Sequence, residues 1–117
     1  HNELEQVVTN IILNAKDAIK QIKTSGDIHI SLTKSGGWIK IEIRDEGIGI
    51  SKELIPKIFD PFFTTKDVGK GTGLGLSICQ AIVEKHYGLI TVQSEPGKGS
   101  VFSVQMPKID VKAKLTT

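Results

Sequence analysis

The chain has 117 residues, 38% of them apolar, and its 15 basic and 13 acidic side chains give a formal charge of +2. These values predict one globular domain with no basic face for nucleic acid, and no apolar run reaches the roughly 20 residues that a membrane span needs. The single cysteine, Cys79, excludes an internal disulfide and favours a reducing compartment, so we expect a cytoplasmic domain. Because the sequence opens on a helical pattern without methionine, we expect it to belong to a longer polypeptide, whose attachment to a membrane stays open.

The first part of the chain predicts a helix followed by a β-hairpin. Apolar residues recur at helical spacing from Asn2 to about Lys23. Segments 27–33 and 38–45 then alternate apolar and polar residues around the turn "SGG", which indicates two antiparallel strands with one face buried. The residues expected on that buried face are Ile28, Ile30, Leu32, Ile39, Ile41 and Ile43.

The second part predicts a short helix, a long loop, a second long helix and a further hairpin. Ser51 is placed to cap a short helix over 52–59, and a helical pattern runs from Leu74 to about His86. Strands over 89–95 and 100–106 follow, joined through "PGKG". This order predicts an α+β, two-layer sandwich: a mixed, mostly antiparallel sheet covered on one face by helices. The loop before the second long helix is expected to act as a lid.

The stretch "VGKGTGLGLSICQAI" places a glycine at every second position just before a helix, at Gly69, Gly71, Gly73 and Gly75. It is not a P-loop, because no Gly-Lys-Ser/Thr occurs, and it is not G-x-G-x-x-G, because the third glycine falls on Leu74 or Leu76. Bare peptide groups at a helix start nevertheless suit an anion, and Lys66 and Lys70 are expected to meet phosphate oxygens. A plain flexible connector is the alternative.

Polar residues interrupt the first helix within "NIILNAKDA", at Asn10, Asn14 and Asp17. The two asparagines lie four residues apart, so they share one face beside the apolar stripe. Amide oxygens are suitable ligands for Mg²⁺, which prefers oxygen donors. The alternative, that these amides satisfy a nearby loop backbone, stays open.

The stretch "RDEGIGI" ends a predicted strand with Asp45 and continues with Gly47 and Gly49. A carboxylate at this place can accept a hydrogen bond from an exocyclic amine such as that of adenine, and the glycines let a flat ring lie close to the backbone. A bulged turn after an edge strand is the alternative. The phenylalanines of "FDPFF" are expected to anchor the lid or to fill the core, and at least two of them to fill the core.

In this order the motifs resemble those of the catalytic, ATP-binding domain of sensor histidine kinases, in the superfamily shared with DNA gyrase, the MutL repair proteins and a heat-shock chaperone. "NIILNAKDA" resembles the N box, "DEGIGI" the first glycine box, "FDPFF" the F box and "GTGLGL" the second glycine box. "GKGSVFSVQMP" resembles the closing glycine and strand segment. The resemblance implies a Bergerat-type ATP-binding domain over residues 1–107, with 108–117 as a flexible tail.

The resemblance also implies a site for ATP and Mg²⁺. Asn14 is expected to bind the metal with support from Asn10, and Asp45 is expected to bind the adenine amine. Asp17 stands where many members carry a basic residue, so it points away from the nucleotide or acts indirectly. The other residues that the resemblance places at the nucleotide site are Asp17, Ala18, Gly47, Gly49, Ile50, Phe59, Thr65, Lys66, Lys70, Gly71, Thr72, Gly73, Leu74, Gly75, Leu76 and Ser100.

The residue four positions before the metal-binding asparagine favours a kinase over an ATPase. Superfamily ATPases carry a glutamate there as general base, whereas this chain has Asn10, whose neutral amide cannot take a proton from water. We therefore expect ATP to be held until a histidine on a separate helical dimerisation domain attacks it, with charge neutralisation and positioning as the task of this domain.

That acceptor histidine is expected outside this chain, because His1, His29 and His86 lack its usual acid and proline neighbours. The expected partners are the helical dimerisation domain and, through it, a response-regulator aspartate, while the isolated domain is expected to be a monomer. Two alternatives remain: a protein serine kinase of the anti-sigma type, and an interaction module that no longer binds nucleotide.

Overall fold

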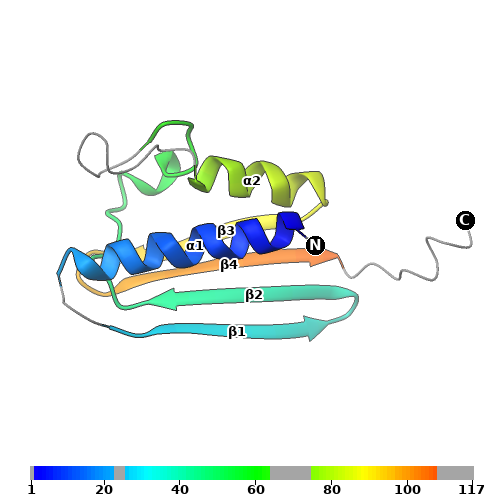
Figure 1. The fold of residues 1–117 in the computed structure, drawn as a ribbon, viewed down its shortest axis with the longest axis horizontal. Coiled ribbons are helices and arrows are strands. Elements are labelled where there is room, and N and C mark those ends of the chain that lie inside the picture. The colour runs from blue at the N-terminus through cyan, green and yellow to red at the C-terminus, as the bar shows by residue number, and fades with distance from the viewer. Residues whose placement is uncertain (1, 23–25, 64–74, 108–117) are drawn as a thin grey trace, which may run out of the picture.

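A computed structural model describes residues 2–22, 26–63 and 75–107, which form a four-stranded sheet with two helices on one face (Figure 1). The strands lie in the order β1-β2-β4-β3, and every pairing between them is antiparallel. This arrangement confirms the predicted α+β sandwich. The elements are α1 (Asn2–Lys20), β1 (Ile28–Ser35), β2 (Trp38–Asp45), the 3₁₀-helix η1 (Ile55–Lys57), α2 (Gly75–Lys85), β3 (Leu89–Glu95) and β4 (Gly99–Pro107).

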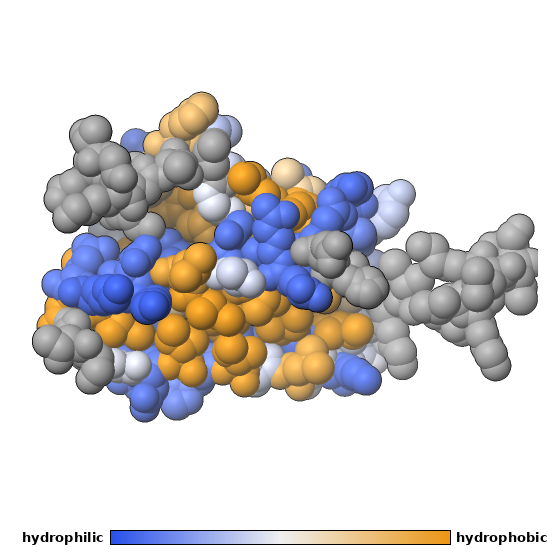
Figure 2. Space-filling view, in the orientation of Figure 1, coloured by the Kyte–Doolittle hydropathy of each residue, from blue (hydrophilic) through white to orange (hydrophobic). Residues whose placement is uncertain are grey.

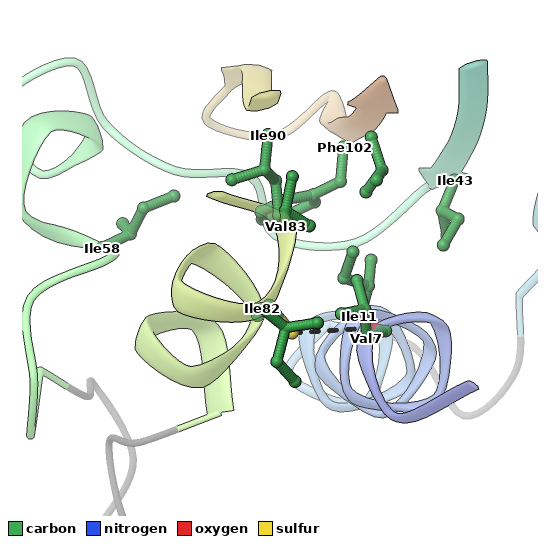
Figure 3. Packing of buried hydrophobic residues seen from close by; sticks show 10 residues of the cluster. Val7, Ile11, Ile43, Ile58, Ile82, Val83, Ile90 and Phe102 are labelled. Carbon is green, nitrogen blue, oxygen red and sulfur yellow. Dashed lines mark hydrogen bonds between the residues drawn. The ribbon is translucent and has the colours of Figure 1, made fainter. Parts of the chain in front are cut away.

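The core lies between the two helices and the β2, β4 and β3 part of the sheet. Apolar positions recur at helical spacing in α1 and at every second position in the strands, so both patterns direct one face inward. Figure 3 shows side chains from both helices and the sheet pointing toward one another. The buried cluster consists of Val7, Ile11, Ile43, Ile58, Cys79, Ile82, Val83, Ile90, Phe102 and Val104.

Strand β1 departs from the expectation that its apolar face is buried. Ile30 is 54% exposed and Leu32 is 61% exposed, whereas Ile43 on β2 is buried. Figure 2 shows apolar side chains gathered on the surface below α1, along β2 and β1. The prediction was wrong for Ile30 and Leu32 because α1 and α2 lie over the other three strands, and no helix among the described residues lies over β1. Alternation correctly indicates which residues share a face, but it does not say whether a helix covers that face.

The short helix predicted over 52–59 is a 3₁₀ turn of three residues, and Ser51 does not cap it with its side chain. Instead, the carbonyl of Ser51 accepts hydrogen bonds from the amides of Leu54 (3.0 Å) and Ile55 (3.2 Å). Pro56 explains the difference, because it has no amide N–H and cannot continue an α-helical ladder. The segment therefore packs as a series of tight turns, which bring Ile58 into the core.

The two long helices match their predicted positions closely. Helix α1 ends at Lys20, three residues before the predicted end, and α2 begins at Gly75 rather than at Leu74. Neither helix, within the part of the chain that the structure describes, is both long enough and apolar enough to cross a bilayer. The predicted tail over 108–117 lies outside the described residues.

Candidate functional site

Asp45, the last residue of β2, is a buried carboxylate with one oxygen that has no hydrogen-bond partner among the described residues. Its side chain is 1% exposed, and Oδ1 accepts a hydrogen bond from the amide of Gly47 at 2.8 Å. No described group reaches Oδ2 with hydrogen-bonding geometry. A buried acceptor left without a donor costs about 1–3 kcal/mol, so an oxygen in this state indicates a place where a ligand can donate.

Burial raises the pKa of the Asp45 carboxyl above its usual value, and the backbone amides of Gly47 and Ser100 oppose that rise. Neither opposing group carries a formal charge, so the charged form of Asp45 is stabilised by dipoles alone. The carboxylate is therefore well placed to receive a donor from outside the protein.

The loop that follows Asp45 is held against α1. A Cβ on Gly47 would lie 2.6 Å from the carbonyl carbon of Ala18 and 2.7 Å from its Cβ, so only glycine permits this approach. The amide of Ile48 donates to the carbonyl of Ala18 at 3.0 Å. These contacts join the last turns of α1 to the loop and fix the position of the neighbouring carboxylate.

The same loop is also held against the β3–β4 hairpin. Gly49 has a left-handed φ of 78°, and a Cβ there would clash with the carbonyl oxygen of Glu95. The amide of Gly97 donates to the carbonyl of Ile48 at 2.8 Å. Both glycines of the motif thus permit close approach between two parts of the backbone, and their predicted role in lining an adenine pocket stays a prediction.

Ser94 links this loop to the end of the sheet, and the sequence analysis did not single it out. Its hydroxyl oxygen accepts a hydrogen bond from the amide of Ile50 at 2.7 Å and donates to the carbonyl of Gly99 at 2.9 Å. The hydroxyl oxygens of Ser94 and Ser100 lie 2.7 Å apart. A signal was available, because Ser94 continues the inward series that begins with Ile90, where a polar residue breaks the apolar alternation.

Ser100, predicted to lie near adenine, is the partner of Asp45 in the pairing of β2 with β4 and is 5% exposed. The two side chains therefore occupy neighbouring positions at one end of the sheet. An open cavity borders the same network, with a lining that includes Ser94 but not Asp45. That cavity is therefore distinct from the site around the carboxylate of Asp45.

The predicted residues of α1 form one stripe that leads toward the loop after Asp45. Asn10, Asn14 and Ala18 follow at intervals of four residues, all are half-buried, and Ala18 touches the loop directly. Asp17, beside them, is also half-buried. The structure thus brings the N box and the first glycine box together, as a common site requires.

Asn10 has a structural contact that the sequence analysis did not predict. Burial raises the pKa of the Cys79 thiol, and a hydrogen bond from the side chain of Asn10 opposes that rise. The thiol itself donates to the carbonyl of Val7, with sulfur and oxygen 3.6 Å apart. The thiol of Cys79 therefore joins α2 to α1 through Val7, and the support of a metal by Asn10 stays a prediction.

The aromatic cluster largely fills the core, as expected for at least two of its members. Phe59 meets Phe102 edge to face at a centroid distance of 6.5 Å, and Phe63 also packs against the buried cluster. Phe62 is 72% exposed. Phe59 thus lies in the apolar wall between η1 and the sheet.

The remaining predicted residues divide into two sets. Ile50 and Leu76 pack against the buried cluster, and Gly75 is the first residue of α2. The other set lies outside the described residues, so its predicted phosphate contacts stay predictions: Thr65, Lys66, Lys70, Gly71, Thr72, Gly73 and Leu74.

A family model described as "Histidine kinase-, DNA gyrase B-, and HSP90-like ATPase" matches residues 1–110, and the chain belongs to this family. Among its relatives are the sensor histidine kinase ZraS of Escherichia coli (strain K12), 44% identical over 106 residues, and sporulation kinase C of Bacillus subtilis (strain 168), 43% identical over 106 residues. These matches cover 91% of this chain but only 22% of ZraS and 24% of sporulation kinase C. The chain thus spans about a quarter of the length of these two relatives.

Solved structures agree with the family. The catalytic domain of the histidine kinase ThkA matches 92% of this chain and 68% of its own, with a TM-score of 0.78 and 37% identity. Full-length ShkA in complex with AMPPNP matches 90% of this chain and 21% of its own, with a TM-score of 0.78 and 26% identity. Within the family, the chain is therefore the catalytic ATP-binding domain of a sensor histidine kinase.

Proposed function

We propose that this domain binds Mg-ATP and presents the γ-phosphate to a histidine on a separate helical dimerisation domain. The observation that carries the proposal is the unused Oδ2 of Asp45, a buried acceptor beside two glycines that hold the surrounding loop in place. An exocyclic amine supplies the donor that this oxygen lacks. The AMPPNP complex of ShkA, which has the same fold, supports an adenine nucleotide as the ligand.

The residues of α1 fit a magnesium ion bound through amide oxygens. Asn14 is half-buried on the stripe that leads to the Asp45 loop, and we assign it as the metal ligand. Mg²⁺, when bound, neutralises phosphate charge and orients the reacting phosphoryl group. Asn10 contributes no general base, so this chain holds the nucleotide without activating water.

The proposed acceptor and partner lie outside this chain. In our proposal a histidine nitrogen attacks the γ-phosphorus, the bond to the β,γ-bridging oxygen breaks, and ADP leaves while the phosphoryl group stays on the histidine. The phosphoryl group then passes to an aspartate of a response regulator. The similarity to a sensor histidine kinase and a sporulation kinase supports a kinase of this class.

Two measurements test the proposal. Isothermal titration with ADP, with and without Mg²⁺, is expected to give binding that Mg²⁺ strengthens, and Asn14→Ala is expected to lose that strengthening. Thr9→Ala, on the exposed face of the same helix, is the matched control and is expected to behave like wild type. Equal Mg²⁺ dependence in wild type and Asn14→Ala would remove Asn14 as a ligand.

The second measurement identifies the reaction. The domain is incubated with γ-labelled ATP and a separately purified histidine phosphoacceptor domain from a relative such as ZraS. We expect label on the acceptor that is lost in acid, as phosphohistidine is. Acid-stable label would instead identify a serine kinase.

A further inference from the structure

We infer that Ser94 is a positioning residue that fixes the hydroxyl of Ser100 as a hydrogen-bond acceptor beside Asp45. In this role Ser94 makes the site select a 6-aminopurine over a 6-oxopurine. The inference rests on the proposed function, since it concerns the specificity of the same nucleotide site.

The protons and lone pairs of the two hydroxyl groups limit the directions of their hydrogen bonds. A serine hydroxyl has one proton to donate and two lone pairs with which to accept. The proton of Ser94 goes to the carbonyl of Gly99, at 2.9 Å, and one of its lone pairs receives the amide proton of Ile50, at 2.7 Å. Only the second lone pair then remains for Ser100, whose oxygen lies 2.7 Å away. The geometry of that contact allows either serine to donate, and the bond of Ser94 to Gly99 assigns Ser100 as the donor.

The unused oxygen of Asp45 agrees with this assignment. No described donor, the Ser100 hydroxyl included, lies in hydrogen-bonding geometry with Oδ2 of Asp45, so the Ser100 proton is not bonded to that oxygen. The proton of Ser100 therefore points to Ser94, and lone pairs of Ser100 remain for other contacts. Asp45 and Ser100 are cross-strand partners, 1% and 5% exposed, so they form a buried pair of acceptors at the end of β2 and β4.

A pair of buried acceptors distinguishes the two kinds of purine. The exocyclic amine of adenine has two N–H groups and can donate to both oxygens, directly or through a water that donates to Ser100. The 6-oxo group of guanine is itself an acceptor, and it would face two acceptors with no proton between them. A site with unpaired buried polar groups rejects such a ligand strongly.

Ser94 has a second effect, which the experiment must separate from the first. Its bond to the amide of Ile50 ties the loop after Asp45 to β3, so its loss loosens the whole site. A looser site weakens both nucleotides alike. The change of hydroxyl polarity, in contrast, weakens the discrimination between them, because a freed Ser100 hydroxyl can turn and donate to an oxo group.

The test is the ratio of the dissociation constants for Mg-GDP and Mg-ADP, measured by isothermal titration. We expect Ser94→Ala to reduce this ratio by about tenfold or more, the size of one buried hydrogen bond. Ser94→Thr keeps the hydroxyl and is expected to hold the ratio within about threefold of wild type. Ser103→Ala, which removes a hydroxyl from β4 in contact with Glu42 on the other face of the sheet, is the control and is expected to leave the ratio unchanged.

The outcomes are distinguishable. If Ser94→Ala weakens both nucleotides equally, Ser94 is only structural and the inference is overturned. If that variant does not fold, Ser100→Ala decides: it retains the bonds of Ser94 to Ile50 and Gly99, and an unchanged ratio overturns the inference, whereas a reduced ratio supports it. Wild-type protein that binds neither nucleotide contradicts the proposed function itself.

Discussion

Replacing Asp45 with asparagine separates the binding role of its carboxylate from its structural role. An asparagine has the same shape, and its amide oxygen can still accept the 2.8 Å hydrogen bond from Gly47. The change falls on Oδ2, which becomes an NH₂ group. The position is 1% exposed, so neither group gains compensating contact with bulk water.

The expected loss of binding follows from that single atom. A hydrogen bond to a buried charged group is worth about 1.5–3 kcal/mol, and the new NH₂ group also opposes a donating amine. Mg-ADP should therefore bind about 10- to 150-fold more weakly to Asp45→Asn than to wild type. The stability of the nucleotide-free domain should instead be equal or greater in Asp45→Asn, because a buried carboxylate without a cationic partner is costly.

The pH dependence of the unfolding free energy provides a second test of Asp45. Because burial raises the pKa of Asp45, the native state binds its proton more tightly than the unfolded chain does. The unfavourable negative charge of buried Asp45 is absent below the usual pKa of 3.8 and fully present above the raised pKa. The unfolding free energy contributed by Asp45 thus falls as pH rises through that interval, and Asp45→Asn should lack this fall.

Isothermal titration with Mg-ADP measures the first effect, and urea unfolding without nucleotide across the acidic range measures the second. The expected pattern is weaker binding together with equal or greater stability at neutral pH. Dissociation constants within about twofold of each other, a difference below the contribution of one hydrogen bond, would refute the proposed amine contact. A large loss of stability would show instead that Asp45 supports the fold.

Three further predictions follow from contacts described above. Gly47→Ala places a methyl group against the backbone of Ala18, so it should cost about 1–3 kcal/mol in urea unfolding and weaken Mg-ADP binding; a stability change below about 0.5 kcal/mol would contradict the close approach. Ile30→Thr should change stability by no more than about 0.5 kcal/mol, since that side chain is 54% exposed, and a loss above about 2 kcal/mol would mean that it is buried in solution. Glu3 accepts contacts from Lys85 and His86, which lower its pKa, so the melting temperature of wild type should exceed that of Glu3→Gln at neutral pH and the difference should vanish as pH falls through the lowered pKa; a difference that persists in acid would contradict this origin.

Asp45 and Ser94 differ in how far the sequence could predict their place in the candidate site. The sequence singled out Asp45 because it ends an alternating strand and precedes two glycines, and the structure shows that it is buried with one oxygen unpartnered among the described residues, while its contact with adenine stays a prediction. Ser94 had only a weak signal, a polar residue in the inward series of its strand, because its contact with Ile50 joins residues 44 positions apart in sequence. The packing of the loop after β2 against β3 brings Ile50 and Ser94 together, and no local sequence pattern encodes that partner.

The fold was also predictable only in part. Periodicity correctly predicted the long helices and all four strands, because each pattern is repeated over several turns or residue pairs. Periodicity did not predict that Ile30 is exposed, because its exposure depends on where α1 lies relative to the sheet. Periodicity also overestimated the length of the short helix, because its proline cannot donate the backbone hydrogen bond that an α-helix needs.

The hydrogen bonds around the glycine loop make its geometry dependent on the whole domain. Ile48 donates to the first helix, Gly97 donates to Ile48 from the last hairpin, and Ile50 donates to that hairpin as well. A nascent chain that has made only the first helix and hairpin therefore has the acidic residue but not its surroundings. The surroundings of Asp45 therefore form only when the first helix and the last hairpin are both in place.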